Sequence, residues 1–248
     1  MRSGRFIISF EAIARALSEG KAISKILIQK GLPLDVIVDI KTLSKRADVP
    51  IQMVPVEKLD RLARGKHQGV IAIRSAVNYY RLESVLPMVY ERGEVPLFLA
   101  LDGVTDVRNV GAIARTVFGA GVHAMIIPST GTAPLGDDAQ TASSGTLSKI
   151  TVCRHPSIHG AVSYLHLNGI KICSADSSGT VMASEVDFRD PVCLVIGDEE
   201  EGVSKAVKSK SDQVIRLPIS RELDSYNVSV AVGMLLYEVM RQRGAMNG

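Results

Sequence analysis

The segment that follows the apolar run at residues 96–103 carries polar side chains at spacings that could serve a reaction. Asn109 lies where a helix N-cap is expected, since a short polar side chain there can accept a backbone N–H. Arg108 and Arg115 share a helix face with only small residues between them, so a phosphate or ribose could approach closely. An amphipathic helix with two solvated arginines is the alternative interpretation. The apolar face of this helix should contain Val110, Ile113, Ala114 and Val117.

A second segment runs from an apolar strand into Gly197, four acids at Asp198–Glu201, and Gly202. Acids at the carboxyl end of a parallel strand face the crevice in which such sheets bind ligands. A helix N-terminus also favours acids through its dipole, but this does not explain the flanking glycines. The chain has no G-x-G-x-x-G after a strand and no G-x-x-x-x-G-K-[ST], so neither a Rossmann dinucleotide site nor a P-loop is supported.

The third segment places a proline-containing loop before Ser225, Tyr226 and Asn227, which we expect to cap a helix. That helix is apolar nearly all round and needs cover on several sides. We therefore expect either the domain core or a second subunit to bury it, and a homodimer is our hypothesis. Its apolar side chains are Val228, Val230, Val232, Leu235, Leu236, Val239 and Met240.

These segments need a scaffold, and the spacing of apolar runs predicts a parallel sheet covered by helices on both faces. Because ligands bind beyond the carboxyl ends of such strands, the loops after residues 103, 197 and 217 should form the site. The expected strands are 96–103, 124–128, 150–154, 171–176, 191–197 and 212–218.

The front of the chain differs from the rest and predicts a separate small α/β domain at residues 1–76. A polar-to-helical connector at 77–94 then leads to a catalytic domain at 95–248. In the front domain we expect a helix that begins at Glu11 and ends at Gly20, β-runs at 25–29 and 35–40, helical pieces at 41–49 and 55–64, and a closing strand at 68–77.

Charge is spread unevenly, because residues 1–76 carry a net charge of +7 and the remainder −4. This asymmetry favours contact between the front domain and a polyanion, although solvated surface lysines explain it equally well. Phe6 and Phe10 are the only aromatic residues there, so we expect RNA contact through cations and backbone rather than a stacking platform. The best candidates are Arg61, Arg64, Lys66 and His67.

Composition bounds the remaining possibilities. With 46% apolar residues the chain can bury a core, and no apolar run approaches the roughly 20 residues that span a bilayer. Charged residues interrupt the first 17 residues, unlike a signal peptide, so we expect a cytoplasmic protein.

The three cysteines should be buried and reduced, since an odd count argues against a disulfide framework. Cys153, His155 and His159 lack a fourth ligand at suitable spacing, and we expect no metal site.

Taken together and in order, the three segments resemble the SpoU branch of the SPOUT methyltransferases. The likeness extends over almost the whole chain and is strongest to the 23S rRNA guanosine 2′-O-methyltransferase subgroup. The front domain resembles the L30e-like substrate-binding domain of that family. The residues that carry the resemblance are N-x-G-x-x-x-R at Asn109, Gly111 and Arg115; G-x-E-x-x-G at Gly197, Glu199 and Gly202; the proline-loop and S-x-N-V-S-V-A patterns at Leu217–Ile219 and Ser225–Ala231; and H-Q-G at His67–Gly69.

The resemblance implies an α/β catalytic domain with a deep trefoil knot and a homodimer with its active site near the subunit interface. It implies a bent S-adenosylmethionine held mostly by backbone around Gly197, Leu217, Ile219, Ser225 and Tyr226. The implied reaction is methylation of a ribose 2′-oxygen in RNA, with a guanosine of 23S rRNA favoured. Transfer RNA is the alternative substrate, and a non-catalytic RNA-binding homologue is the alternative of another class.

The resemblance also assigns roles to individual residues. Arg115 is the activator that the family pattern proposes, and because a guanidinium is almost always protonated we expect it to position the hydroxyl and stabilise the forming alkoxide. From the charges of the side chains themselves, we expect Glu199 to orient Arg115 as an ion pair and Arg108 to contact phosphate. Asn109, Ser225 and Asn227 would supply hydrogen bonds. The chain departs from the family pattern at Ile219, Arg221 and Tyr226.

Overall fold

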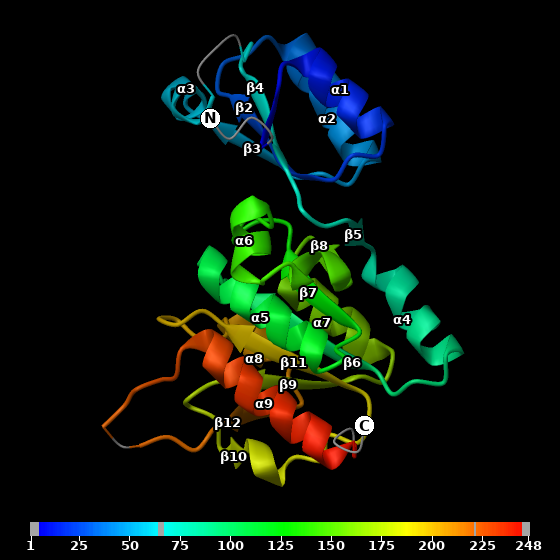
Figure 1. Ribbon diagram of the computed structural model, residues 1–248, viewed down its shortest axis with the longest axis vertical. Helices are drawn as coiled ribbons and strands as arrows, with labels where there is room; N and C mark the ends of the chain where they lie inside the picture. Colours follow the sequence, from blue (N-terminus) through cyan, green and yellow to red (C-terminus); the bar gives the residue numbers. More distant parts are fainter. Residues whose placement is uncertain (1–4, 64–66, 221, 245–248) are drawn as a thin grey trace. The chain divides into compact units, whose positions relative to one another are not determined.

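The structure is a computed structural model that describes residues 5–63, 67–220 and 222–244. The chain forms two compact units (Figure 1). The N-terminal unit extends to Val77 and includes Pro134–Asp137, and the C-terminal unit comprises Asn78–Ala133 and the chain from Asp138 onward. Each unit has a sheet and a core of its own, so the expected α/β class is confirmed.

In the described part of the N-terminal unit, four strands form a mixed sheet in the order β1-β4-β2-β3. Side chains from α1 and α2 pack into the core on one face, and α3 packs against the other face. The elements are β1 (Phe6–Ile8), α1 (Phe10–Ser18), β2 (Ile23–Gln29), α2 (Leu34–Arg46), β3 (Ile51–Val54), α3 (Val56–Leu62) and β4 (Val70–Arg74).

One element of this unit was predicted wrongly. Residues 35–40 have the β-branched composition of a strand but form the first half of α2. Pro33 precedes the helix, Asp35 lies in its first turn, and basic residues lie in its last turn, all of which favour a helix. Ile40 and Ser44, four residues apart, are buried on the same side, so tertiary packing outweighs the β propensity of single residues.

The described residues of the C-terminal unit form an eight-stranded sheet in the order β10-β12-β9-β11-β6-β7-β8-β5, and every strand pairing in it is parallel. All six strands expected from the sequence are present. The sheet contains β5 (Tyr79–Tyr80), β6 (Leu97–Asp102), β7 (Ala124–Pro128), β8 (Val152–His155), β9 (Lys171–Ala175), β10 (Val181–Met182), β11 (Val192–Gly197) and β12 (Gln213–Arg216).

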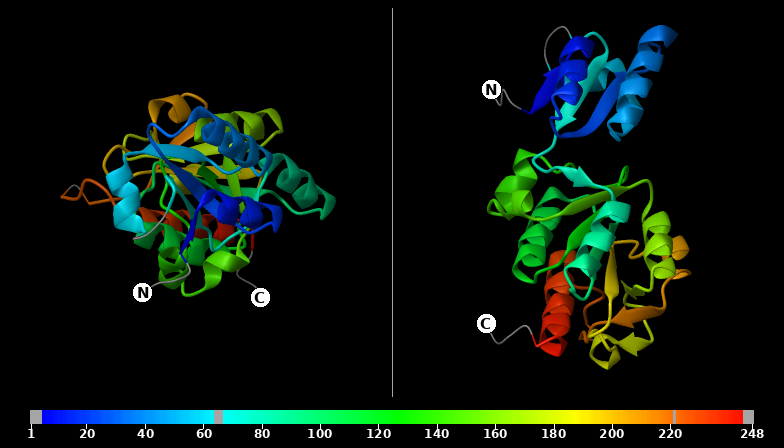
Figure 2. Two further views of the ribbon diagram at one scale, coloured as in Figure 1. Left: turned by 90° about the horizontal axis from the view of Figure 1, so that it is seen from above. Right: turned by 90° about the vertical axis from the view of Figure 1, so that its right-hand side faces the viewer.

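Helices cover both faces of this sheet (Figure 2). The helices α4 (Leu82–Glu91), α7 (Ile158–Leu167) and α8 (Lys205–Lys208) pack against one face. The helices α5 (Val107–Gly119) and α9 (Val228–Gln242) pack against each other, on the face opposite α7 in the right-hand view. The predicted apolar face of α5 is confirmed, since Val110, Ile113, Ala114 and Val117 are buried. The described residues also form the short helices α6 (Asp137–Ala142), η1 (Thr146–Lys149) and η2 (Ala183–Glu185).

The segment expected to connect two domains, residues 77–94, contains β5 and α4, and from Asn78 onward it is part of the C-terminal unit. Leu82, Val85, Leu86 and Val89 of α4 are buried in the same core as the central strands. The three-part division at 76 and 95 stays a prediction, and α4 indicates that an independent C-terminal fragment must begin near Asn78.

The last helix is largely but not completely buried. Val228, Val232, Leu235, Leu236 and Val239 of α9 are buried within the unit. Val230 and Tyr237 are 50% and 55% exposed and lie on the side of α9 that the unit does not cover. None of the helices in the described residues has the length and apolarity that a membrane crossing requires.

The three cysteines lie buried in β8, β9 and β11 with no disulfide between them, as expected. Burial raises the pKa of the Cys153 and Cys173 thiols to about 12, and of Cys193 further still. These side chains are therefore inert packing groups.

Candidate active site

A cavity of about 870 Å³ lies at the carboxyl ends of β9, β11 and β12, where a parallel sheet is expected to bind its ligand. All five residues predicted to hold a cofactor line it: Gly197, Leu217, Ile219, Ser225 and Tyr226. The lining also contains Asp176, Ser177, Ser178 and Lys208, which the sequence interpretation missed.

Two glycines make the wall of this cavity possible. A Cβ atom on Gly197 would lie 1.9 Å from the carbonyl carbon of Gly202, so the chain can fold back here only without a side chain. Gly202 has a φ of +66°, in the left-handed region that favours glycine. Asp198 closes the turn, because its Oδ1 accepts the N–H groups of Glu200 and Glu201 at 2.8 and 2.9 Å. The acids thus belong to a tight loop that precedes α8, not to a helix N-terminus.

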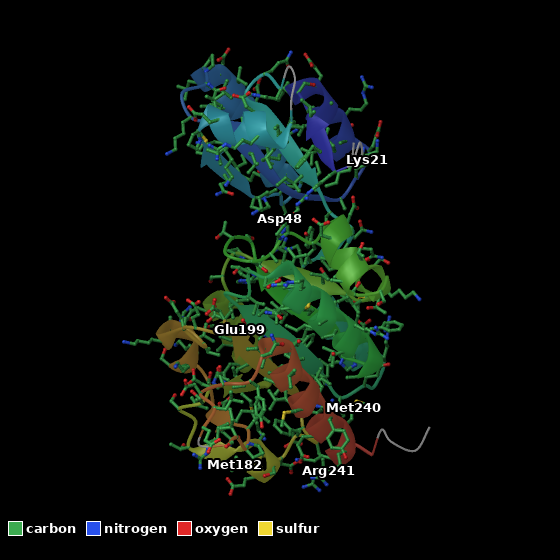
Figure 3. The ribbon with its side chains drawn as sticks, turned by 60° about the vertical axis from the view of Figure 1, so that its left-hand side comes forward. Lys21, Asp48, Met182, Glu199, Met240 and Arg241 are labelled. Atoms are coloured by element: carbon green, nitrogen blue, oxygen red, sulfur yellow. The ribbon has the colours of Figure 1, made fainter. Side chains whose placement is uncertain are left out.

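At the edge of the cavity, one hydrogen-bonded network joins Asn109, Glu199 and Asn227. Glu199 Oε1 accepts from Asn109 Nδ2 at 3.0 Å and from Asn227 Nδ2 at 2.6 Å. Asn227 Nδ2 also donates to Asn109 Oδ1 at 3.0 Å, and the N–H of Val228 approaches Glu199 at 3.4 Å. Figure 3 labels Glu199 near the beginning of α9. The structure therefore brings three polar residues from three distant segments into contact.

The capping residues at this site were predicted with mixed success. Asn227 is the N-cap of α9, as expected, and its Oδ1 accepts from the N–H of Ser229 at 3.0 Å. The N-cap of α5 is Asp106, not Asn109, which lies within the first turn of the helix. Because Asp106 caps the helix one turn earlier, the Asn109 side chain is not used as a cap and can donate to Glu199 instead.

Arg115 does not form the predicted ion pair with Glu199 among the described residues. Its Nη1 instead donates to Ser144 Oγ at 3.3 Å. The reason is distance along the helix. Glu199 lies at Asn109, and Arg115 follows Asn109 by six residues, which is roughly 9 Å along the α5 axis at the α-helical rise. The Glu199 carboxylate instead accepts hydrogen bonds from two asparagine amides. Arg115 is exposed to solvent, as are Glu199, Ser225 and Asn227.

The small residues on the Arg108 face of α5 have a packing role. A Cβ atom on Gly111 would lie 2.3 Å from Ala142 Cβ, so this face receives the chain at residues 142–143 and does not stay open for a ribose. Arg108 is 88% exposed and pairs with Asp106 at 2.8 Å. Hydrogen bonding to Asp106 raises the pKa of Arg108, so this guanidinium stays charged at the surface.

Internal hydrogen bonds hold the remaining cavity wall. Tyr226 Oη donates to the carbonyl of Pro218 at 2.8 Å, which ties the loop after β12 to the start of α9. Lys208 Nζ donates to Asp176 Oδ2 at 2.8 Å, with the Asp176 side chain 9% exposed. Burial alone would raise the pKa of Asp176, but hydrogen bonds from Lys208 and Ser178 outweigh it and lower the pKa. Arg221, a departure from the family pattern, lies outside the described residues.

The residues predicted to contact RNA in the N-terminal unit fall into different environments. Arg61 is exposed on α3, and Arg64 and Lys66 lie outside the described residues. His67 is only 7% exposed. Its Nε2 is 2.9 Å from Asp60 Oδ1, and its Nδ1 accepts the N–H of Gly69 at 3.0 Å. We therefore assign His67 to holding the turn before β4 rather than to RNA contact.

Comparison with protein families gives two matches that together cover most of the chain. Residues 96–237 match the SpoU rRNA Methylase family. Residues 7–80 match the family described as RNA 2′-O ribose methyltransferase substrate binding.

Individual relatives agree with this result. A Bacillus subtilis protein, YacO, placed by its name in the TrmH family of tRNA/rRNA methyltransferases, is 32% identical over 238 residues, 96% of each chain. Among solved structures, the SpoU methyltransferase AviRb from Streptomyces viridochromogenes, in complex with AdoMet, is 22% identical, with a TM-score of 0.62 over 98% of this chain and 92% of that one. The TrmH/SpoU tRNA modifying enzyme of A. aeolicus is 28% identical, with a TM-score of 0.56 over 66% of this chain and 85% of that one.

Proposed function

This chain belongs to the SpoU family of RNA 2′-O-ribose methyltransferases, and we propose that it methylates the ribose 2′-oxygen of a guanosine in 23S ribosomal RNA. The observation that carries the proposal is the network of Asn109, Glu199 and Asn227 at the edge of the glycine-walled cavity. This network unites all three segments of the family pattern at one place in the fold.

The methyl donor is S-adenosylmethionine, which supplies an electrophilic methyl group on a sulfonium. The cavity fits a molecule of this kind, because its volume falls within the roughly 300–1,000 Å³ of small-molecule sites. At Gly197 and Gly202 its wall is backbone packed too closely against neighbouring protein atoms for a side chain to fit. Gly197, Leu217, Ile219, Ser225 and Tyr226 would hold the cofactor.

The residues of this chain contribute alignment and charge. Asn109 and Asn227, fixed by Glu199, present a rigid polar edge beside the cavity, and such preorganisation lowers the cost of aligning two reactants. Ser225 lies on the cavity wall, where its hydroxyl can hydrogen bond to a nucleotide. Arg115 positions the 2′-hydroxyl and stabilises the alkoxide that forms as its proton leaves.

Within one chain Arg115 stands apart from that edge, and we propose that a homodimer completes the site. The exposed side of α9, with Val230 and Tyr237, is an apolar surface of the kind that subunit interfaces cover. Because α5 packs against α9, a dimer formed through α9 also places α5 near the interface. Arg115 of the partner subunit would then act at the network of this chain.

Ribosomal RNA is favoured over transfer RNA by the N-terminal unit, which matches a substrate-binding family. The A. aeolicus tRNA modifying enzyme aligns with only 66% of this chain. Transfer RNA remains the second candidate, because relatives such as YacO carry both substrates in their names. A non-catalytic RNA-binding protein is disfavoured by the intact network around Glu199.

The test is calorimetric titration with S-adenosylmethionine followed by single-turnover methyl transfer to 23S rRNA and tRNA transcripts. Gly197→Ala should abolish cofactor binding, since its Cβ would collide with Gly202. Gly119→Ala is the matched control, because a Cβ there meets open space. A wild-type protein that binds no cofactor would refute the proposed activity. Transfer to tRNA alone would refute the ribosomal substrate, and mapping 2′-O-methyl groups in RNA from a deletion strain would identify the nucleotide.

A further inference from the structure

Among the described residues, α3 buries only part of one face of the N-terminal sheet. Leu59 and Ala63, on and directly after α3, complete a buried cluster with Leu27, Val54 and Ile71 on that face. The next cross-strand row consists of Phe6 on β1, Ile73 on β4 and Lys25 on β2, which are direct partners in the sheet register. All three are only partly buried. We call Phe6, Ile73 and Lys25 the open row.

Two lysines lie close together at one end of the open row. Burial, and then the charge of nearby Lys58 on α3, lower the pKa of Lys25, so its ammonium is partly desolvated beside a like charge. Among the described residues, no carboxylate forms a salt bridge with Lys25 or Lys58. Asp60 on α3 is engaged by His67. An anion bound between these two lysines would relieve their repulsion.

The aromatic end of the row has a cation of its own. The guanidinium carbon of Arg5 lies 5.6 Å from the centroid of the Phe6 ring, within the range of a cation–π contact. An unpaired base can stack on such a pair, because aromatic rings and guanidinium planes both serve as stacking surfaces. The sequence interpretation discounted such stacking for lack of aromatic residues, but the fold places Phe6 on the open face of the sheet.

We propose that the open row binds a single-stranded segment of RNA, with a base stacked on Phe6 beside Arg5 and a phosphate near Lys25 and Lys58. The proposal rests on the proposed function and names the form of RNA that the N-terminal unit recognises. Single-stranded RNA is the partner that fits, because it offers free base faces together with regularly spaced phosphates. A duplex keeps its bases stacked and gives Phe6 no partner.

The experiment measures binding of the full chain to a fluorescent oligouridine of about 12 nucleotides, and to a duplex of equal length, over a range of salt concentrations. Phe6→Leu should weaken single-strand binding about 5- to 150-fold, the range of one base–aromatic stack. Lys25→Met should weaken it as well and reduce the slope of log affinity against log salt by about 0.7, the value for one phosphate contact on a single strand. Lys41→Met is the matched control, because Lys41 is exposed on α2, which packs on the other face of the sheet.

Stability separates RNA binding from a merely structural role. Removing a half-buried, unpaired ammonium should leave the thermal unfolding temperature unchanged or raise it, so weaker RNA binding by Lys25→Met cannot arise from unfolding. The proposal is overturned if both Phe6→Leu and Lys25→Met bind the single strand as Lys41→Met does, or if wild type prefers the duplex. Either result leaves the proposed function standing, provided that wild type still binds S-adenosylmethionine and methylates RNA. Failure of the wild type in those two assays refutes the proposed function instead.

Discussion

Replacing Arg115 with alanine tests both its role and the subunit in which it acts. The described contacts of this side chain amount to one long hydrogen bond, from Nη1 to Ser144 Oγ at 3.3 Å, on an exposed helix face. Its loss should change the free energy of unfolding by less than about 0.5 kcal/mol. Cofactor affinity should also be unchanged, because Arg115 does not line the cavity. Methyl transfer should nevertheless fall at least about a hundredfold, the effect of losing a preorganised donor or a proton-transfer partner.

Mixing two inactive variants distinguishes action within a chain from action across the interface. Arg115→Ala lacks the guanidinium, and Gly197→Ala lacks a usable cavity. If Arg115 acts on the partner subunit, a hybrid dimer has one complete site, with the guanidinium from one chain and the cavity from the other. After equal mixing and subunit exchange, half of the dimers are hybrids, so activity should recover to about a quarter of the wild-type value.

The assay is single-turnover methylation with saturating enzyme and cofactor, alongside sedimentation to confirm that hybrids form. No recovery in a mixture that contains hybrid dimers would place Arg115 at the site of its own chain. Transfer by Arg115→Ala within about threefold of wild type, less than 1 kcal/mol by the rate arithmetic, would show that its catalytic assignment is wrong. Sedimentation of the wild type as a monomer at micromolar concentration would contradict the homodimer itself.

Three further outcomes follow from the fold. Arg243 donates four hydrogen bonds to carbonyl groups that precede β6 and β11. Arg243→Leu should therefore lower the free energy of unfolding, measured in urea, by about 2–4 kcal/mol. The control Arg241→Leu loses only the pair with Glu238 on its own helix and should change this free energy by less than about 1 kcal/mol. A fragment of residues 78–248 should fold and should bind S-adenosylmethionine in a calorimetric titration. A fragment of residues 95–248 should unfold at a lower temperature, because it lacks α4. Equal unfolding temperatures of the two fragments would contradict this role of α4. With its pKa near 12, the Cys153 thiol should resist a thiol reagent at pH 8 until urea unfolds the chain, and labelling of the native protein would show that it is accessible.

Regular elements of the C-terminal unit were predictable because their signal is local. Strands buried on both faces have nearly continuous apolar runs, and these runs located all six expected strands. The same reasoning failed at residues 35–40, where β-branched side chains occur in an amphipathic helix whose buried positions are set by the sheet beneath it. The five cavity residues implied by the family resemblance do line the cavity, whereas Asp176, Ser177, Ser178 and Lys208 belong to no motif and were missed.

Contacts within the site could not be predicted, since they join residues far apart in the chain. Asn109 meets a carboxylate 90 residues away and an amide 118 residues away, and no local pattern specifies either partner. The expected pairing of Glu199 with Arg115 rested on charge alone, and the fold instead gives this carboxylate two asparagine amides. The burial of His67 was not predictable from the neighbouring sequence either, because it depends on contacts of its ring with Asp60 and with the turn before β4.

By itself, then, the sequence determined which residue types are present and which strands, helices and loops bring them to the carboxyl edge of a sheet. The spacing of apolar residues, the length of apolar runs and the positions of glycines are local features, so they can be recognised without coordinates. Only the tertiary structure decided that Asn109, Glu199 and Asn227 form one network, that Arg115 stands apart from it, and that Phe6 lies on an open sheet face. These outcomes depend on strand order and on the register of helices against the sheet, which arise from packing across the whole unit.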